Sequence, residues 1–265
     1  MAKNPAAGLP LSLQTHLEQL AGQAGFVAEC LKTGKRLSYG NRPFFAASTI
    51  KLPILAMYCA AAERDWIPDV PYYYQSEDWI EDSPYFEHLA PGTPVSWYEV
   101  ARQMTIISDN TATNLLIKLF GLPRLQGWIR KNGLKQTRIE RRMMDLEARA
   151  RGIDNWTTPE DMVLLMKKLV RHQLSEPGPE GCEQMLAILH QQQDREKIPF
   201  LFNPPVFVAN KPGELPGTRS DVGYIHDGQA EIVLAVFADQ LENESASDLW
   251  LAQLAHLLWS ELTNS

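Results

Sequence analysis

Residues 46–62 decide the fold, and they read AASTIKLPILAMYCAAA. Apolar side chains fill almost every position after Thr49, which predicts a strongly apolar helix over Ser48–Ala62. Lys51 is the exception in this stretch. A lysine in such surroundings is expected to be buried, and a buried lysine is expected to serve a purpose.

Strand and helix patterns alternate on both sides of this helix. Before it, the apolar spacing predicts a helix at Leu11–Leu20 and strands at Ala24–Leu31 and Arg36–Tyr39. After it, residues 65–94 are irregular and rich in aromatics. The spacing predicts helices at Ser96–Ile107, Thr111–Leu119, Pro123–Lys131, Glu180–Gln191 and Ser247–Leu262, and a further helix that begins at Thr157-Thr158-Pro159-Glu160 and ends near His172. It also predicts a long loop with one helical turn at Arg138–Asn155. Strands are predicted at Pro205–Lys211, Asp221–His226 and Ala230–Ala238.

This order of elements predicts an α/β (α+β) fold. Strands from both chain ends would form one five-stranded antiparallel sheet, flanked by the N- and C-terminal helices. We expect one catalytic domain in two parts: residues 1–45 and 200–265 form the sheet subdomain, and residues 46–199 form an all-helical subdomain. Pockets favour such boundaries, so the site is expected in the cleft between the two parts.

Composition excludes several function classes. The 265 residues include 25 Lys and Arg against 32 Asp and Glu, a net charge of −7 that disfavours nucleic acid as a partner. No apolar run reaches the ~18 residues of a membrane span. Met1–Pro10 lacks the apolar core of a signal peptide, so the chain is expected to be cytoplasmic as supplied, or periplasmic or secreted after loss of a leader. We expect a monomer.

Motifs for metals and cofactors are missing from the sequence. The three cysteines, Cys30, Cys59 and Cys182, lie far apart without a Cys-x-x-Cys pair and are expected to be buried thiols. The histidines lack metal-binding spacing, and no phosphate-binding or dinucleotide-binding glycine motif is present. The sequence therefore implies neither a metal nor another cofactor.

Ser48 and Lys51 are the first candidates for chemistry. A serine hydroxyl needs a neighbouring base, and the i, i+3 spacing puts Lys51 on the same helix face one turn away. Burial and the helix N-terminus both push a lysine toward its neutral form, which can act as a base. Free N–H groups at the same helix start can hold an oxyanion. The alternative is a solvated serine cap beside a surface lysine.

Two further elements follow along the chain. Ser108-Asp109-Asn110 stands at a helix junction, where it is either a helix cap or a pair of groups that relay a proton (Ser108) and grip a substrate amide (Asn110). A lysine-glycine element occurs at Lys32-Thr33-Gly34, Lys131-Asn132-Gly133 and Lys211-Pro212-Gly213. The third is preferred, because it alone follows the other two elements and ends a predicted edge strand.

Ser-x-x-Lys, Ser-Asp-Asn and Lys-x-Gly in this order resemble the penicillin-recognising serine hydrolases, and class A β-lactamases in particular. The resemblance covers about residues 20–262. It implies that Ser48 is acylated, that Lys51 is its base or proton relay and that Ser108 protonates the leaving group. Among the remaining residues, it implies that Asn110, Lys211, Gly213 and Glu214 bind substrate, that Asn114 braces the neighbouring loop, and that the oxyanion hole consists of the N–H groups of Ser48 and Glu214.

The sequence departs from this family's pattern at two places. Pro212 replaces the usual Thr or Ser, whose hydroxyl helps to hold the substrate carboxylate; Arg219 could substitute for it, or could be a solvated sheet-edge arginine. The family's Glu-x-x-Leu-Asn segment is also missing. Without a gap, the deacylating glutamate falls on Met143, and with a gap it falls on Asp145 or Glu147. Glu147 is our candidate base, against the alternative of a solvated loop charge.

An aromatic run, with Trp66, Tyr72, Trp79 and Phe86 among its members, either packs an irregular segment or forms a hydrophobic wall of the cleft. The sequence as a whole predicts a cofactor-free serine acyl hydrolase acting on β-lactams or related amides. Two alternatives remain open: an esterase or DD-peptidase-like enzyme with poor β-lactam turnover, and a β-lactam- or peptidoglycan-binding module that acylates, or only binds, without turnover.

Overall fold

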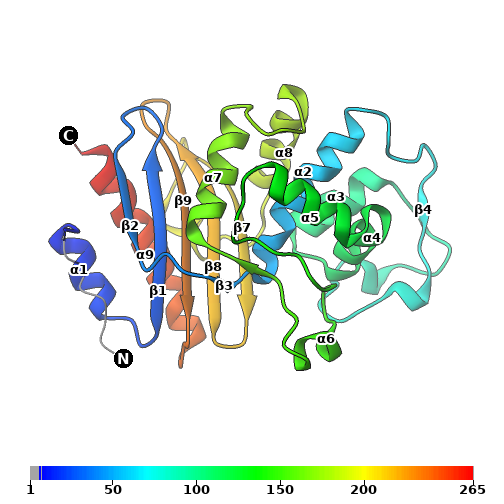
Figure 1. Ribbon diagram of the computed structural model, residues 1–265, viewed down its shortest axis with the longest axis horizontal. Coiled ribbons are helices and arrows are strands. Elements are labelled where there is room, and N and C mark those ends of the chain that lie inside the picture. The colour runs from blue at the N-terminus through cyan, green and yellow to red at the C-terminus, as the bar shows by residue number, and fades with distance from the viewer. Residues whose placement is uncertain (1–5, 7, 265) are drawn as a thin grey trace.

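The computed structural model describes residue 6 and residues 8–264, and its centre is a five-stranded antiparallel sheet in the order β2-β1-β9-β8-β7 (Figure 1). Both chain ends supply its strands, as the sequence predicts. Most of the Met1–Pro10 stretch lies outside the described residues. The strands are β1 (Gln23–Cys30), β2 (Arg36–Tyr39), β7 (Phe207–Leu215), β8 (Thr218–His226) and β9 (Glu231–Asp239).

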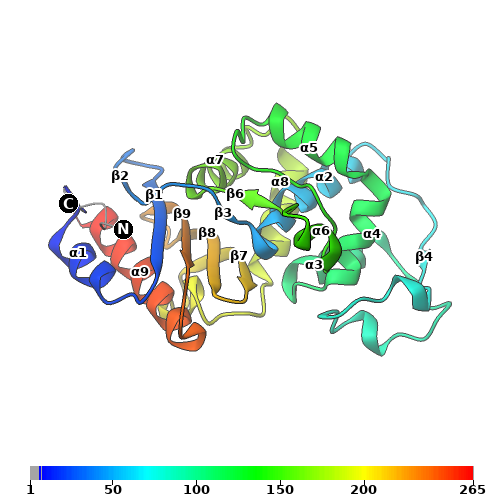
Figure 2. The ribbon, with the colours of Figure 1, turned by 60° about the horizontal axis from the view of Figure 1, so that its bottom comes forward.

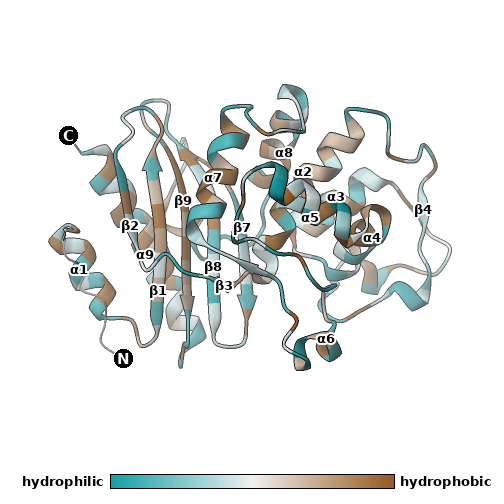
Figure 3. Cartoon of the chain, in the orientation of Figure 1, coloured by the Kyte–Doolittle hydropathy of each residue, from teal (hydrophilic) through white to brown (hydrophobic). Residues whose placement is uncertain are grey.

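Helices cover both faces of the sheet (Figure 2). On one face lie α1 (Leu11–Glu18) and α9 (Glu244–Thr263), and on the other lies α7 (Pro159–Val170). Because both faces are covered, the inner residues of β9 are all buried, and Figure 3 shows hydrophobic colour along β1 and β9. A strand covered on both faces carries a continuous apolar run, which explains the sequence Ile-Val-Leu-Ala-Val-Phe-Ala in β9.

The second part of the molecule is a helical block around α2 (Lys51–Ala62). Ten of the residues of α2 are buried, as its apolar sequence requires. A 3-10 turn at Ala47–Ile50 leads into it, so Ser48 lies on that turn and not on the predicted α-helix. The other long helices of the block are α3 (Trp97–Ile106), α4 (Asn110–Phe120), α5 (Leu122–Lys131) and α8 (Pro179–His190). The shorter elements of the chain are β3 (Phe44–Phe45), β4 (Tyr72–Tyr73), β5 (Pro94–Val95), β6 (Trp156–Thr157), α6 (Leu146–Ala150) and the 3-10 turns Ser76–Asp78, Phe86–His88 and Ile198–Leu201.

Two differences from the sequence prediction affect the site. The strand expected to end at Lys211 continues to Leu215, because β7 is an edge strand, where a proline such as Pro212 is tolerated. The block over residues 46–199 is also not wholly helical, since β4 pairs with β5, and β6 pairs with β3. The predicted helical turn of the 138–155 loop is confirmed as α6. Within the described residues, no helix combines the length and apolar character of a membrane span.

Candidate active site

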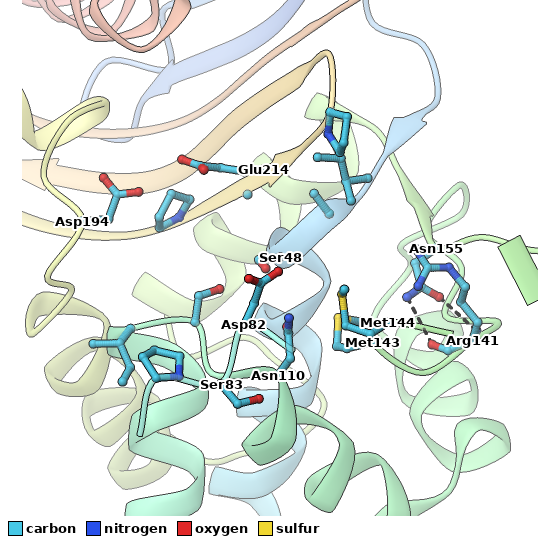
Figure 4. A pocket seen from close by; sticks show the side chains of 18 of the residues that line it. Ser48, Asp82, Ser83, Asn110, Arg141, Met143, Met144, Asn155, Asp194 and Glu214 are labelled. Carbon is cyan, nitrogen blue, oxygen red and sulfur yellow. Dashed lines mark hydrogen bonds between the residues drawn. The ribbon is translucent and has the colours of Figure 1, made fainter. Parts of the chain in front are cut away.

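A cleft of about 980 Å³ lies between the edge strand β7 and the helical block (Figure 4). Three chain segments meet there: the turn before α2, the junction of α3 with α4, and the middle of β7. The loop before α6 and the segment before α3 add two further walls. The residues that line it are Ala47, Ser48, Asp82, Ser83, Pro84, Glu87, Ile107, Ser108, Asn110, Arg141, Met143, Met144, Leu146, Arg149, Asp154, Asn155, Gln192, Gln193, Asp194, Pro212, Gly213, Glu214, Leu215 and Pro216.

Lys51 lies at the base of this cleft, and its side chain is only 1% exposed. Its Nζ lies 3.0 Å from Ser108 Oγ, 2.5 Å from Ser108 O and 2.9 Å from Asn110 Oδ1. Burial lowers the pKa of Lys51 well below its usual value, and the nearby Lys211 charge lowers it further. A neutral amine has two N–H groups and one lone pair, so it can donate to two of these acceptors and take a proton from a hydroxyl.

The backbone of Ser108 is in a strained conformation. Its φ of 62° lies in the left-handed region, where a non-glycine residue persists only if its surroundings hold it there. The next residue, Asp109, does the capping that the sequence left open: its Oδ1 accepts from Ala112 N at 2.8 Å, and its Oδ2 accepts from Tyr85 N at 3.0 Å. The Ser-Asp-Asn element therefore divides its roles, with Asp109 capping α4 while Ser108 and Asn110 line the cleft.

Lys211 reaches the same hydroxyl from the sheet. Its side chain is fully buried, and Nζ donates to Ser108 Oγ at 3.1 Å and to Pro212 O at 3.0 Å. Burial lowers the pKa of Lys211 to about 8. The other two lysine-glycine candidates lie elsewhere: Lys32 Nζ bonds Gln229 O, and Lys131 pairs with Glu176 at 3.2 Å. Of the three, Lys211 is the one at the site.

Gly213 leaves room beside the nucleophile. A Cβ at this position would lie 3.1 Å from Ser48 N and 3.0 Å from Thr49 N, so any side chain would crowd the start of the Ser48 turn. The next residue, Glu214, also lines the cleft, and its carboxylate accepts from the buried Lys197 at 2.5 Å. The strand therefore runs past Ser48 with its backbone close to the Ser48 N–H group.

Asn114 holds the loop that forms the opposite wall. Its Nδ2 donates to Met143 O at 3.1 Å, and its Oδ1 accepts from Met143 N at 2.8 Å. The backbone of Met143 is therefore fixed in both directions, and the side chains of Met143 and Met144 line the cleft (Figure 4).

The structure does not bring Glu147 into the cleft. Its side chain is 84% exposed and pairs with Arg151 at 2.6 Å, one turn along α6. Asp145 caps the same helix through Ala148 N at 2.9 Å. The loop carboxylate that does line the cleft is Asp154, and it is bound by Arg141 at 2.7 Å and Arg149 at 3.4 Å.

Arg219 is also directed away from the cleft. Its side chain is 11% exposed, and its guanidinium pairs with Glu244 at 2.7 Å and Asp248 at 3.4 Å, both on α9. Lys211 and Arg219 occupy opposite faces of the sheet: Glu214 is paired with Arg219, whereas Lys211 is paired with Val222, an odd number of positions away on each strand. Neither interpretation of Arg219 from the sequence, as a carboxylate ligand or as a solvated residue, agrees with this placement.

Of the two interpretations of the aromatic run, the hydrophobic wall is wrong. None of the aromatic residues of segment 66–86 lines the cleft, and among the described residues the cleft lining includes no aromatic side chain. Tyr74 and Phe86 are buried in the helical block instead, whereas Trp66 and Tyr73 are exposed. The part of this segment that does face Ser48 is Asp82-Ser83-Pro84, which sequence reasoning missed because no motif marks these three residues within the aromatic segment.

Metal ligation receives no support from the described residues, since none of their His, Cys, Asp and Glu side chains form a group of three or more that could hold an ion. Cys30, Cys59 and Cys182 are buried and unpaired.

A five-stranded antiparallel sheet covered by helices and packed beside a helical block is the fold of class A β-lactamases. The sequence profile of the β-lactamase enzyme family matches residues 11–262, so the chain belongs to this family. No curated protein sequence matches the chain.

Solved structures share this fold. A β-lactamase from Sphaerobacter thermophilus DSM 20745 has a TM-score of 0.86 and 25% identity, with 95% of this chain and 94% of that one covered. The ancestral (GNCA) class A β-lactamase has a TM-score of 0.85 and 25% identity, with coverage of 94% and 98%. PBP-A has a TM-score of 0.85 and 23% identity, with 98% of both chains covered.

Proposed function

We propose that the chain is a serine hydrolase that is acylated at Ser48 by β-lactams or related amides, and that it releases the acyl group slowly. The observation that carries this proposal is the position of Lys51: its amine is shared by Ser108 and Asn110 at the base of the cleft that holds Ser48. A variant of PBP-A, at 24% identity, was solved as an acyl-enzyme complex with penicillin G, which supports a penicillin as the first substrate to test.

Acylation needs a base, an oxyanion hole and an acid. In the proposed mechanism, the Lys51 amine, neutral because it is buried, takes the Ser48 proton as Ser48 Oγ attacks the carbonyl carbon. The N–H groups of Ser48 and Glu214 stabilise the oxyanion. Ser108, contacted by the amine groups of Lys51 and Lys211, then gives its proton to the departing nitrogen and takes up the proton that Lys51 received from Ser48. Asn110 binds the substrate amide.

Deacylation needs a second base that directs water at the ester. The loop of the 141–155 wall offers Met143 and Met144 to the cleft, and its Asp154 is already paired with Arg141 and Arg149. A thioether has no basic oxygen, so this wall cannot activate water in the way a free carboxylate would. The ester on Ser48 is therefore expected to persist.

An esterase or DD-peptidase-like activity is the second candidate, and Pro212 favours it. This proline has neither a hydroxyl nor an N–H group to offer a substrate carboxylate, and Arg219 points to α9. Substrates in which the carboxylate matters less than it does in β-lactams would suffer less from these two features.

Intact-protein mass spectrometry after mixing with benzylpenicillin tests the proposal. We expect an adduct of the penicillin mass that forms on Ser48 and persists while little penicilloate accumulates; Ser48→Ala should give no adduct. Rapid penicilloate formation with a short-lived adduct would mean that an efficient deacylating base exists. The absence of adduct and product would move the search to esters and peptides.

A further inference from the structure

The wall of the cleft that faces the nucleophile carries an acid. Asp82-Ser83-Pro84 lines the cleft, and Figure 4 shows the Asp82 carboxylate projecting from this wall toward Ser48. The side chain of Asp82 is exposed and has no hydrogen-bonded or ion-paired partner among the described residues. Its negative charge raises the pKa of Lys51 at the base of the cleft, and so offsets part of the lowering caused by burial.

This acid is held in place by the catalytic elements. Asp82 O accepts from Asn110 N at 3.2 Å, and the φ of Asp82 is 56°, in the left-handed region. Ser83, which is buried, accepts from Thr111 N at 2.8 Å. The wall is thus attached to the first turn of α4, so the backbone that carries the Asp82 carboxylate is held at the edge of the cleft.

The arginines that line the cleft, and Lys197 beside it, are already paired with carboxylates. Arg141 and Arg149 share Asp154, and Lys197 binds Glu214 and Asp194. A substrate carboxylate placed near Asp82 would therefore find no free arginine and an unpaired negative charge. A substrate cation at the same place would be attracted by the unpaired Asp82 carboxylate.

We propose that Asp82 is a specificity-determining residue that selects acyl groups bearing a cationic amine on the acyl side chain. This inference rests on the proposed acylation of Ser48 and adds the substrate class. An ammonium group on the acyl side would pair with the Asp82 carboxylate, whereas an anionic acyl group would be repelled by it.

Three penicillins with one nucleus test the proposal: ampicillin, benzylpenicillin and carbenicillin carry an ammonium, a hydrogen and a carboxylate at the same α-carbon. The second-order rate of adduct formation is measured by mass spectrometry at low salt. We expect ampicillin to acylate about fivefold faster than benzylpenicillin, the scale of a partly exposed ion pair, and carbenicillin to acylate more slowly than both.

The variant Asp82→Asn should bring the three rates together, and salt should do the same in part. Glu81→Gln is the matched control, because it removes one negative charge from the neighbouring residue, which does not line the cleft, and it should keep the order of rates. Equal rates in the unmodified chain, or ratios that Asp82→Asn leaves intact, would overturn the inference.

Failure of the proposed function gives a different result. If none of the three penicillins forms an adduct or is converted to penicilloate, acylation by β-lactams is refuted. The S-phenyl thioesters of glycine N-acylated with the same three phenylacetyl groups, which keep the spacing between the scissile carbonyl and the charged group, then decide on Asp82 through the rate of thiol release. A preference for the α-amino thioester that Asp82→Asn abolishes supports the inference, and its absence refutes it.

Discussion

Replacing Met143 by glutamate should convert slow deacylation into turnover. Met143 lines the cleft, its side chain is mostly buried, and both its backbone N–H and its C=O are held by Asn114. Glutamate has the same number of side-chain atoms along its length, so its carboxylate would occupy the place of the thioether. A positioned general base contributes about 10²–10⁴-fold to a rate, and the lower bound corresponds to roughly 2.7 kcal/mol of activation free energy.

The carboxylate has a cost in stability. Partial burial of a charged group beside Met144 would lower the free energy of unfolding by about 1–3 kcal/mol if no hydrogen bond compensates. Since the residue borders a cleft, water can solvate one side of the carboxylate, and we expect the variant to fold.

The assay is the decay of the Ser48–penicillin adduct after removal of excess penicillin, followed by intact mass. Met143→Gln is the control, because it has the shape of the glutamate variant without its basicity. The Met143→Glu adduct should decay about a hundredfold faster than that of the unmodified chain, and the advantage should disappear as acid protonates the new carboxylate. An unchanged adduct lifetime in a folded Glu variant, or an equal acceleration in the Gln variant, would refute the reasoning.

Three further predictions concern the acylation machinery and the loop. Lys51→Met should lower the rate of adduct formation by about 10²-fold or more, because the base is lost, with thermal melting as the check that the chain still folds. Since burial lowers the pKa of Lys211 to about 8, its ammonium is present below that pH and lost above it, so the rate of acylation by benzylpenicillin, which carries a carboxylate, should fall as the pH rises through about 8. A flat rate in this pH window would show that Lys211 does not attract the substrate. Asn114→Ala removes two hydrogen bonds to Met143 and should reduce the free energy of unfolding by about 1–3 kcal/mol in urea titrations; a smaller change would mean that the loop is held by other contacts.

Local patterns are enough to predict the sheet and to single out the residues that we propose for acylation. Alternation and turn residues locate the strands, and the apolar neighbours of Lys51 along the chain indicate that this lysine is buried. Lys211 can be chosen among three lysine-glycine elements because the order of elements places only that one on a strand near Ser108. These features are local, or depend on chain order alone, so the sequence contains them directly.

Arg219 and Glu147 cannot be placed in this way, because their directions depend on register and loop path. Strand β8 begins at Thr218, a few residues before the start predicted at Asp221. Arg219 therefore lies on the same face of the strand as Asp221, opposite Lys211 and next to α9. Glu147 lies within α6, whose short helical turn points that side chain to solvent while Leu146 lines the cleft. A shift of one residue in β8 or in α6 would point the side chain of Arg219 or Glu147 in a different direction.

The two halves of the proposed reaction rest on different parts of the structure. Acylation uses Ser48, Lys51 and Lys211, which lie on buried helix starts and a paired strand, where packing fixes each group. Deacylation would use a side chain from the loop wall, where Asn114 fixes the backbone of residue 143 and the side chain at that position supplies no base. Because Asn114 holds the loop through the backbone of residue 143 and not through its side chain, a hydrolase with fast turnover and a protein that stays acylated can share one fold, one cleft and one set of acylating residues. The identity of residue 143, and not the architecture around it, is therefore expected to decide how long the acyl group stays on Ser48.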